Sequence, residues 1–334
     1  MKKINLDIVR FLASLLIIAI HISPFDQISS EFDFFFTRIL CRIAVPLFLM
    51  ITGYFLLDKG LKDINILKSY SKKILKIYIL CIIIYLPINI YAHSYENMNV
   101  VTFLKDILIN GTFYHLWYFP ALILGLWITY FLIKKLGSKS IIIISLLYII
   151  GLFGDSYYGL VEMNNFTNYL YNGLFKIFDY TRNGIFYVPI FIYLGYLIKI
   201  KKKEYKYTLI YIISLFIGMT LEGFLLHNLN FQRHDSMYIF LIPLMYFLFN
   251  YLINHCKGKN KRLRNIATEI YIFHPLIIVI VRFISDLINL ENIIVNNHLL
   301  FYIIVSISSI ILAITIEKVR GIFIVNERVP KQIK

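Results

Sequence analysis

The sequence predicts an all-α protein, a polytopic bundle of about ten transmembrane helices that forms one domain over residues 1–334. Two observations carry this prediction. The 334-residue chain is 59% hydrophobic and only 16% charged, with a mean hydropathy of +0.72, which lies well outside the range of soluble globular domains. Its basic residues also gather in alternate loops between the apolar stretches. A multi-pass protein of a cell membrane is therefore expected.

Each predicted span must supply about 20 mostly apolar residues, because backbone amides inside the bilayer have no water to bond. Ten stretches meet this length or come close to it. The fifth and sixth are short, and the ninth contains Glu269, His274 and Arg282. The segment 154–182 is predicted to be an outer re-entrant or capping loop. In chain order the predicted stretches are Leu6–Ile22, Phe34–Leu57, Ile74–Tyr91, His115–Ile133, Ser140–Phe153, Asn183–Ile198, Tyr205–Leu226, Ser236–Asn254, Ile266–Ser285 and Leu299–Ile316.

The loop charges predict the orientation, since Lys and Arg beside the spans are retained on the cytoplasmic side during insertion. Both termini are thus predicted to be cytoplasmic, and acidic residues dominate the intervening outer loops. Topology and attraction to anionic inner-leaflet lipid explain the net charge of +15, so no nucleic-acid partner is expected. The basic segments are Lys2–Lys3, Lys59–Lys76, Lys134–Lys139, Lys199–Lys206, Lys257–Arg264 and the tail from Lys318.

Several other features of the sequence predict no function. The amino terminus looks like a signal peptide, but Asp7 and Arg10 interrupt its apolar run and no cleavage site follows, so we expect a retained first helix. Cys41, Cys81 and Cys256 are far apart and form no disulfide or metal pattern. The sequence contains no HExxH, Walker, GxSxG or GxGxxG motif, and no metal site is predicted.

Ionisable side chains within the apolar stretches are the candidate functional residues, because a charge at the centre of a span costs about 2.5 to 3.5 kcal/mol on insertion scales. Arg10 and His21 both lie on the first predicted helix. Their separation of eleven residues places them on one helix face, about 16 Å apart along the axis. Arg10 is expected near the cytoplasmic end of this helix and His21 near its outer end.

Most other candidates converge on the outer half of the predicted bundle. His274 lies near the middle of the ninth stretch, and Pro275 frees a backbone carbonyl that a neighbouring polar group can use. The outer candidates are Arg42 in the second stretch, His115 at the start of the fourth, Arg182 at the start of the sixth, Glu222 in the seventh, and Arg233, His234 and Asp235 in the loop after it.

Structural roles stay open for some of these residues. A lone buried histidine such as His115 or His274 often only packs and hydrogen-bonds, and arginines near an interface often snorkel to lipid headgroups. Snorkelling is an alternative for Arg10, Arg182 and Arg233. A shared polar cavity is favoured for the combination of Arg10, His21, Arg42 and Glu222.

Three sequence blocks resemble the acyltransferase-3 family. Arg10, followed by ten residues and His21, matches the Arg-x10-His signature of that family. The run Arg42-Ile43-Ala44-Val45-Pro46-Leu47-Phe48 with Thr52-Gly53-Tyr54-Phe55 resembles its second block, and His115-Leu116-Trp117-Tyr118 resembles its third.

A narrower likeness spans nearly the whole chain. The runs from Asn110 to Pro120, Gly154 to Ser156, Thr181 to Phe186 and Arg233 to Tyr238 look like the membrane half of VanT-type serine racemases of vancomycin-resistant Gram-positive bacteria. The pyridoxal-phosphate racemase half of those proteins is absent from this sequence. Neither pyridoxal phosphate nor racemase activity is therefore expected of this chain.

The family resemblance implies transfer of an acyl group at a bacterial cell membrane. The donor is commonly cytoplasmic acetyl-CoA or another acyl-CoA, and the acceptor is a hydroxyl or amine at the outer face, such as a glycan, the cell wall or a small molecule. On this interpretation Arg10 holds the anionic donor and His21 is the general base. Arg42 and His115 stabilise charge on the carbonyl oxygen, Glu222 or Asp235 orients His21 or the acceptor, and Arg182, His234 and His274 complete the substrate-binding set.

The narrower likeness implies a part in L-serine uptake instead. In that case Arg42 and Glu222 hold the carboxylate and the ammonium of serine. A purely structural subunit is a third interpretation, and the number of ionisable groups in the predicted spans disfavours it. Residue types alone do not separate the first two, and the sequence leaves the acceptor, the acyl chain and the oligomeric state open.

Overall fold

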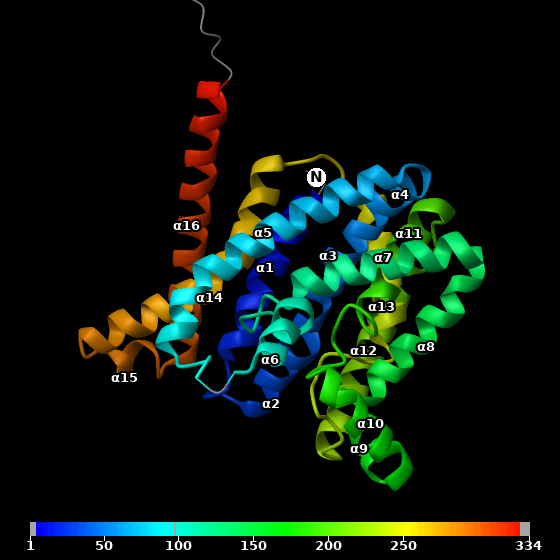
Figure 1. The fold of residues 1–334 in the computed structure, drawn as a ribbon, viewed down its shortest axis with the longest axis horizontal. Coiled ribbons are helices and arrows are strands. Elements are labelled where there is room, and N and C mark those ends of the chain that lie inside the picture. The colour runs from blue at the N-terminus through cyan, green and yellow to red at the C-terminus, as the bar shows by residue number, and fades with distance from the viewer. Residues whose placement is uncertain (1–4, 97, 328–334) are drawn as a thin grey trace, which may run out of the picture. The chain divides into compact units, whose positions relative to one another are not determined.

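The computed structural model describes residues 5–96 and 98–327, and these residues form helices and loops without a strand. The all-α prediction is thus confirmed (Figure 1). Helices α1, α11 and α13 have 17, 14 and 15 residues, which is fewer than the about 20 residues that cross a bilayer. The full set of ten spans therefore stays a prediction. In the described residues, six helical segments are long and apolar enough to cross a membrane, namely Ser30–Lys62, Ile64–Tyr91, Tyr118–Phe153, Thr208–Asn228, Lys261–Leu287 and His298–Arg320.

The described residues form a series of helices of very different length. In chain order they are α1 (Leu6–Ile22), α2 (Ser30–Asp33), η1 (Phe34–Ile39), η2 (Leu40–Ile43), α3 (Ala44–Thr52), η3 (Gly53–Leu57), α4 (Asp58–Lys62), α5 (Ile64–Tyr91), α6 (Val100–Lys105), η4 (Asp106–Asn110), α7 (Tyr118–Leu136), η5 (Gly137–Lys139), α8 (Ser140–Phe153), α9 (Tyr158–Glu162), α10 (Asn165–Ile177), α11 (Val188–Lys201), α12 (Thr208–Asn228), α13 (Leu241–His255), α14 (Lys261–Leu287), α15 (Glu291–Ile294) and α16 (His298–Glu327).

The chain divides into two compact units by its internal contacts. The first unit contains residues 1–44 and 253–334, and the second contains residues 45–252. The prediction of one domain over residues 1–334 stays a prediction.

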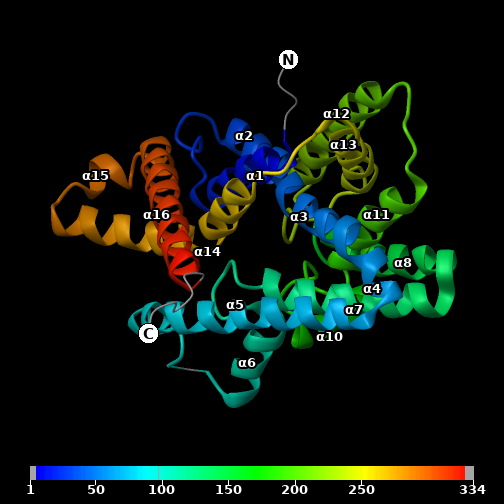
Figure 2. The same cartoon turned by 90° about the horizontal axis from the view of Figure 1, so that it is seen from above.

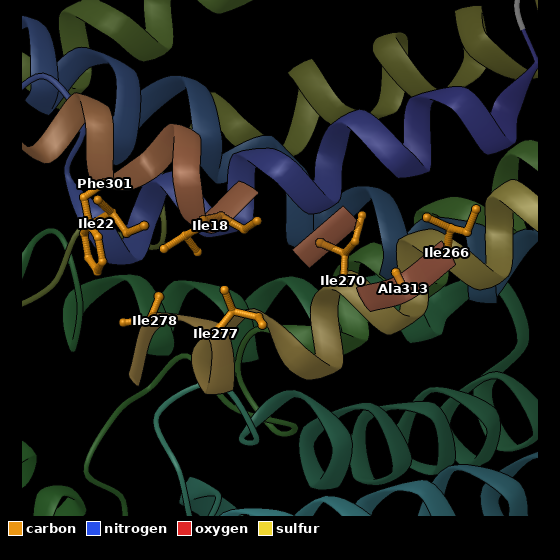
Figure 3. Packing of buried hydrophobic residues seen from close by; sticks show 9 residues of the cluster. Ile18, Ile22, Ile266, Ile270, Ile277, Ile278, Phe301 and Ala313 are labelled. Carbon is orange, nitrogen blue, oxygen red and sulfur yellow. The ribbon is translucent and has the colours of Figure 1, made fainter. Parts of the chain in front are cut away.

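The first unit is built on the long helices α1, α14 and α16. Their apolar faces meet in one buried cluster, in which Ile18 and Ile22 come from α1, Ile270 and Ile277 from α14, and Phe301 from α16 (Figure 3). All five side chains are less than a tenth exposed. Burial of these aliphatic and aromatic groups against one another holds the three helices together, because close packing supplies the attraction between helices in lipid.

Helices α1 and α14 run parallel. At their amino-terminal ends, the Asn260 backbone N–H donates to Oδ2 of Asp7 at 2.7 Å. Fourteen residues further along each helix, the rings of His21 and His274 stack with centroids 5.4 Å apart. The two helices therefore keep one register over about 21 Å of axis.

Helix α16 runs antiparallel to these two. Near its start, Nδ1 of His298 bonds to the carbonyl of Ser23, which caps the end of α1. Further along α16, Arg320 pairs with Glu269 in the first part of α14 at 2.5 Å. The beginning of α1, the beginning of α14 and the later part of α16 thus lie at the same end of this unit.

The second predicted stretch, Phe34–Leu57, is helical but irregular. It begins with a π-helical turn, continues through the 3-10 segment η2 and ends in a second π-helical turn, η3. Pro46 has no backbone N–H to donate to the carbonyl of Arg42, four residues earlier. This missing hydrogen bond fits the change of helix type just before α3. The sequence prediction of a simple helix missed these changes of winding.

The second unit surrounds the buried helix α11. Its close neighbours are α3 with η3, α7 and α8 (Figure 2). A Cβ added to Gly195 would lie 2.1 Å from the carbonyl oxygen of Met50, and one added to Gly53 would lie 2.0 Å from that of Ile192. Glycine at both positions lets the two backbones approach as closely as small residues allow in membrane proteins.

The region 154–182, predicted as a capping or re-entrant loop, contains the short helices α9 and α10. The Tyr171 hydroxyl of α10 donates to the carbonyl of Ile150 near the end of α8 at 2.8 Å. The opposite face of α10 exposes Phe166, Tyr169 and Leu170. The loop prediction missed this amphipathic helix because its asparagines lower the local hydropathy.

Candidate functional site

The first unit brings together His21 and His274, two of the candidates from the sequence. Their ring planes are inclined by 26° at a centroid distance of 5.4 Å. His274 is fully buried and His21 is half-buried. Both belong to a line of residues at seven-residue spacing, which we call the α1–α14 seam. It contains Asp7, Ser14 and His21 on α1, and Asn260, which caps the start of α14, with Ala267 and His274 on α14 itself.

Pro275 explains the orientation of the His274 ring. Proline has no N–H, so the carbonyl of Tyr271 four residues earlier lacks its usual helical donor. Nδ1 of His274 lies 2.9 Å from that carbonyl oxygen and 3.1 Å from the carbonyl oxygen of Ile270. Carbonyl oxygens only accept hydrogen bonds, so Nδ1 carries a proton. The predicted use of the freed carbonyl by a neighbouring polar group is therefore confirmed.

Arg10 lies at the other end of the α1–α14 seam. Its Nη1 bonds to Oδ1 of Asp7 at 2.7 Å, while Oδ2 of Asp7 accepts the Asn260 backbone N–H. The Asp7 carboxylate thus compensates the arginine charge and fixes the start of α14. Asp7 was not among the candidates from the sequence, although its position three residues before Arg10 is the signal for such a pair.

Arg42 also belongs to the first unit and lies in the 3-10 segment η2. The residue is buried, with 8% of its surface exposed. Within the described residues, its buried Nε has no hydrogen-bond partner. A buried guanidinium N–H of this kind is suited to bind an oxygen of a substrate or a water molecule.

Glu222 lies in the second unit and holds a loop. Its Oε1 accepts the Tyr157 hydroxyl at 2.8 Å and the Ile239 backbone N–H at 2.7 Å, and its Oε2 accepts the Phe240 backbone N–H at 3.0 Å. Burial, and secondly the bond to Glu222, raises the pKa of Tyr157 above its ordinary value, so its hydroxyl stays protonated and donates. Glu222 therefore fixes the chain just before α13.

Asp155 is a second buried carboxylate of this unit, and the sequence reasoning did not single it out as a site residue. It is fully buried, and its Oδ1 accepts the backbone N–H groups of Ser236 at 2.7 Å and Met237 at 3.0 Å. Its own carbonyl accepts the Arg233 backbone N–H. Asp155 thereby shapes the loop that carries His234 and Asp235. The available signal was its place in the Gly154-Asp155-Ser156 run.

Arg182 lies against aromatic rings in the second unit. Its guanidinium carbon is 4.7 Å from the Trp117 ring centroid and 5.5 Å from that of Tyr180. Nη1 of Arg182 donates to the Ser236 hydroxyl at 3.2 Å, and the His234 ring lies 4.5 Å from Tyr180. We call Arg182, Trp117, Tyr180 and His234 the arginine shelf. All four side chains are partly exposed.

His115, Arg233 and Asp235 complete the predicted set in this unit. His115 is 1% exposed and packs edge-on against Tyr85 at 4.9 Å. The guanidinium carbon of Arg233 lies 3.4 Å from the centroid of the Phe175 ring. Asp235 is half-buried. The candidates thus separate into Arg10, His21, Arg42 and His274 in the first unit and Glu222, His115, Arg182, His234 and Asp235 in the second.

Metal ligands do not gather in the part of the chain that the structure describes. No group of three or more His, Cys, Asp or Glu side chains there is placed to hold a metal ion. The chemistry that the described residues offer is that of imidazoles, guanidinium groups and hydrogen-bonded carboxylates. Such groups bind anions, exchange protons and stabilise oxyanions.

Comparison with known proteins identifies similar sequences. A family model described as "Acyltransferase domain" (Acyl_transf_3) matches residues 3–318. An amino-acid racemase of Enterococcus faecalis is 42% identical over 318 residues, which cover 93% of this chain and 44% of that protein. Another amino-acid racemase of Enterococcus faecalis is 38% identical over 92% of this chain and 45% of that protein.

A serine/alanine racemase of Enterococcus gallinarum is 35% identical over 325 residues, covering 93% of this chain and 45% of that protein. The chain thus spans less than half the length of these curated relatives. No solved structure matches the chain.

Proposed function

We propose that this chain, which belongs to the acyltransferase-3 family, moves an acyl group across a bacterial cell membrane. The group passes from acyl-CoA to an outer acceptor. The donor is cytoplasmic acyl-CoA, with acetyl as the expected group. The acceptor is a hydroxyl or an amine at the outer face. The stacked pair of His21 and His274 is the observation that carries this proposal, because it places an accessible imidazole beside a buried, oriented one.

The proposed topology has ten spans with both ends in the cytoplasm. The beginning of α1, the beginning of α14 and the later part of α16 lie at one end of the first unit. The basic segment 257–264 precedes α14 at that same end, and Lys and Arg favour the cytoplasmic side. His21, fourteen residues further along α1 than Asp7, then lies toward the outer side.

His21 is assigned as the general base of the transfer. Its imidazole takes the proton of the acceptor hydroxyl as the oxygen attacks the thioester carbon. The new C–O bond forms, the C–S bond breaks, and the CoA thiolate leaves with the proton that the imidazolium returns. No oxidant or metal is needed for this balance.

Arginines are assigned to the negative charges of the reaction. Arg42, whose buried Nε has no partner in the described residues, stabilises the oxyanion that forms at the acyl carbon. Arg10, at the cytoplasmic end of the α1–α14 seam, holds the anionic donor together with the neighbouring basic segment. Its ion pair with Asp7 fixes the direction of the side chain.

The second unit is assigned to the acceptor. The arginine shelf combines a cation with aromatic faces, and these groups suit the oxygens and ring faces of a sugar or the carboxylate of an amino acid. Asp235 and His115 are assigned to the same substrate-binding set. Glu222 acts on it indirectly, by fixing the chain before α13.

L-serine uptake is the second candidate function, and the names of the racemase relatives favour it. In this case Arg42, with its buried Nε, takes the carboxylate of serine. Transport leaves acyl-CoA unused, whereas transfer to serine consumes it. The two functions are therefore separable in one preparation.

The test uses the full chain in sealed proteoliposomes. Acetyl-CoA labelled in the acetyl group is supplied on one side, and labelled serine or a muramyl sugar on the other. Release of the CoA thiol together with labelling of an acceptor supports the transferase. Serine accumulation at the same rate with and without CoA, and without thiol release, would replace it by the transporter.

A further inference from the structure

We propose that His274 is a positioning residue that fixes the ring of His21 for proton transfer, with Pro275 as the element that sets its orientation. This inference rests on the proposed role of His21 as the general base. His274 would act through His21 and not touch the reacting atoms. The sequence predicted His274 as a substrate-binding residue, and its contacts with Tyr271 and His21 favour this different role.

The register of α1 and α14 brings the two histidines together. Both helices are tied at Asp7 and Asn260, and both histidines lie fourteen residues further on. Fourteen residues are two heptads, so a parallel pair of helices returns to the same seam at this distance. The midpoint residues Ser14 and Ala267 are small and at most 1% exposed, as a close seam requires.

The hydrogen bonds of His274 fix its ring. Nδ1–H reaches the carbonyl of Tyr271 at 2.9 Å, which Pro275 leaves without a backbone donor. The ring is fully buried, so it cannot exchange this bond for one with water. In the neutral imidazole the proton therefore stays on Nδ1, and Nε2 keeps its lone pair.

The fixed ring constrains His21. The face of His274 lies 5.4 Å from that of His21 with the planes 26° apart, an offset-stacked geometry. His21 comes from the last turn of α1 and is half-buried. Stacking on an immobile ring limits its side-chain rotamers. A base held in this way meets the acceptor hydroxyl in a reactive direction.

Orientation of a base affects the transition state more than the binding of substrate. Loss of the fixed ring should therefore lower kcat and leave KM nearly unchanged. A histidine that only fills space would give another result, because its replacement would lower stability and leave the kcat of the folded enzyme intact.

Three variants separate these roles. His274→Phe keeps a ring but removes the Nδ1–H donor. His274→Asn keeps an N–H donor at the corresponding position but removes the stacking ring. Pro275→Ala changes neither histidine and returns a backbone N–H to the Tyr271 carbonyl, which then competes with His274. Pro87→Ala is the matched control, since Pro87 lies inside α5 and outside the proposed site.

We expect kcat to fall about tenfold or more in His274→Phe and His274→Asn, with KM within about twofold of the original. Pro275→Ala should lower kcat while its thermal unfolding temperature stays equal or rises, because an interior proline disfavours a helix. Pro87→Ala should leave kcat unchanged. If the folded His274→Phe and Pro275→Ala enzymes keep the kcat of the unchanged enzyme, His274 is not a positioning residue.

A double-mutant comparison tests the action through His21. In a His21→Ala background, His274→Phe should have no further effect on the residual rate. An equal loss in both backgrounds would contradict a positioning role. If His21→Ala itself keeps full transfer, the proposed function fails, whereas a dead His21→Ala enzyme beside a fully active His274→Phe enzyme removes only the present inference.

A spectroscopic measurement is independent of activity. With 15N-histidine in the full chain, the neutral His274 ring should show the Nδ1–H tautomer, and Pro275→Ala should shift its Nδ1 resonance. A proton on Nε2, or a spectrum that Pro275→Ala leaves unchanged, would overturn the assignment.

Discussion

At the scale of single residues, buried carboxylates fix chain segments that are distant in sequence. Asp7 accepts a backbone N–H from Asn260, and Asp155 accepts two, from Ser236 and Met237. Glu222 does the same just before α13. An ionised carboxylate that accepts several N–H groups compensates for the loss of water around it. These acids thus position the histidines and arginines to which we assign the chemistry.

Replacement of Glu222 tests this positioning. The Tyr157 hydroxyl and two backbone N–H groups donate to the Glu222 carboxylate. Glu222→Gln replaces one accepting oxygen by an NH2 group, which cannot accept these bonds, so we expect a loss of about 1–3 kcal/mol in unfolding free energy. Thermal unfolding in detergent measures the effect. Glu162→Gln, on an exposed side chain of α9, is the control and should change little. Equal unfolding temperatures for the two variants would refute the anchoring role.

The arginine shelf gives a second residue-scale prediction. Arg182→Lys keeps the charge but loses the planar group that lies over Trp117. We expect the KM for the acceptor to rise about tenfold, with the KM for acyl-CoA and kcat nearly unchanged. Steady-state kinetics with each substrate varied in turn provides the measurement. A selective rise in the KM for acyl-CoA would assign the shelf to the donor instead.

Single helices show what the sequence could predict. The predicted boundaries of α1 and α8 agree with the structure to the residue, because Asn5 and Ser23 cap α1 and Lys139 and Gly154 flank α8. The predicted start of α14 was five residues late, since Lys261 and Arg264 lowered the hydropathy but continue the helix. The winding changes around Arg42 depend on packing, which hydropathy does not describe.

The glycines of the α3–η3 and α11 crossing give a prediction at this scale. Gly195→Ala would place a methyl group 2.1 Å from the Met50 carbonyl oxygen, so the helices must separate. We expect a clear fall in the thermal unfolding temperature. Gly173→Ala is the matched control, because no atom lies within 4 Å of the added Cβ and alanine favours a helix by about 0.5–1 kcal/mol. A Gly195→Ala protein as stable as Gly173→Ala would show that the helices do not approach so closely.

At the scale of the whole molecule, the charge pattern predicts sidedness and the contacts of the first unit are consistent with it. The basic segment before α14 and the beginning of α1 lie at one end of this unit, as the alternation requires. The pairing of His21 with His274 could not be deduced from hydropathy alone. It depends on the parallel register of two helices that are more than 200 residues apart in the sequence, for which the two equal fourteen-residue spacings are the only sequence signal we identify.

Single cysteines in a background without Cys41, Cys81 and Cys256 test the sidedness. We expect Lys202→Cys and Lys259→Cys to react with an impermeant maleimide only after the cell is opened. Gln27→Cys and Asn292→Cys should react on intact cells, since these positions lie in predicted outer loops. Gel-shift labelling reports both results. Labelling of Lys259→Cys on intact cells would invert the proposed direction of transfer.

The role of His21 is the central claim, and acyl transfer by His21→Ala tests it most directly. The measurement is the rate of acceptor labelling from acetyl-CoA, per folded enzyme, in proteoliposomes. His93→Ala serves as the control because His93 is an exposed loop residue paired with Glu96. If His21 is the general base, His21→Ala should insert and fold but lose at least about 100-fold in rate, while His93→Ala should keep the original rate. Transfer by His21→Ala at the rate of His93→Ala would show that His21 is not the general base.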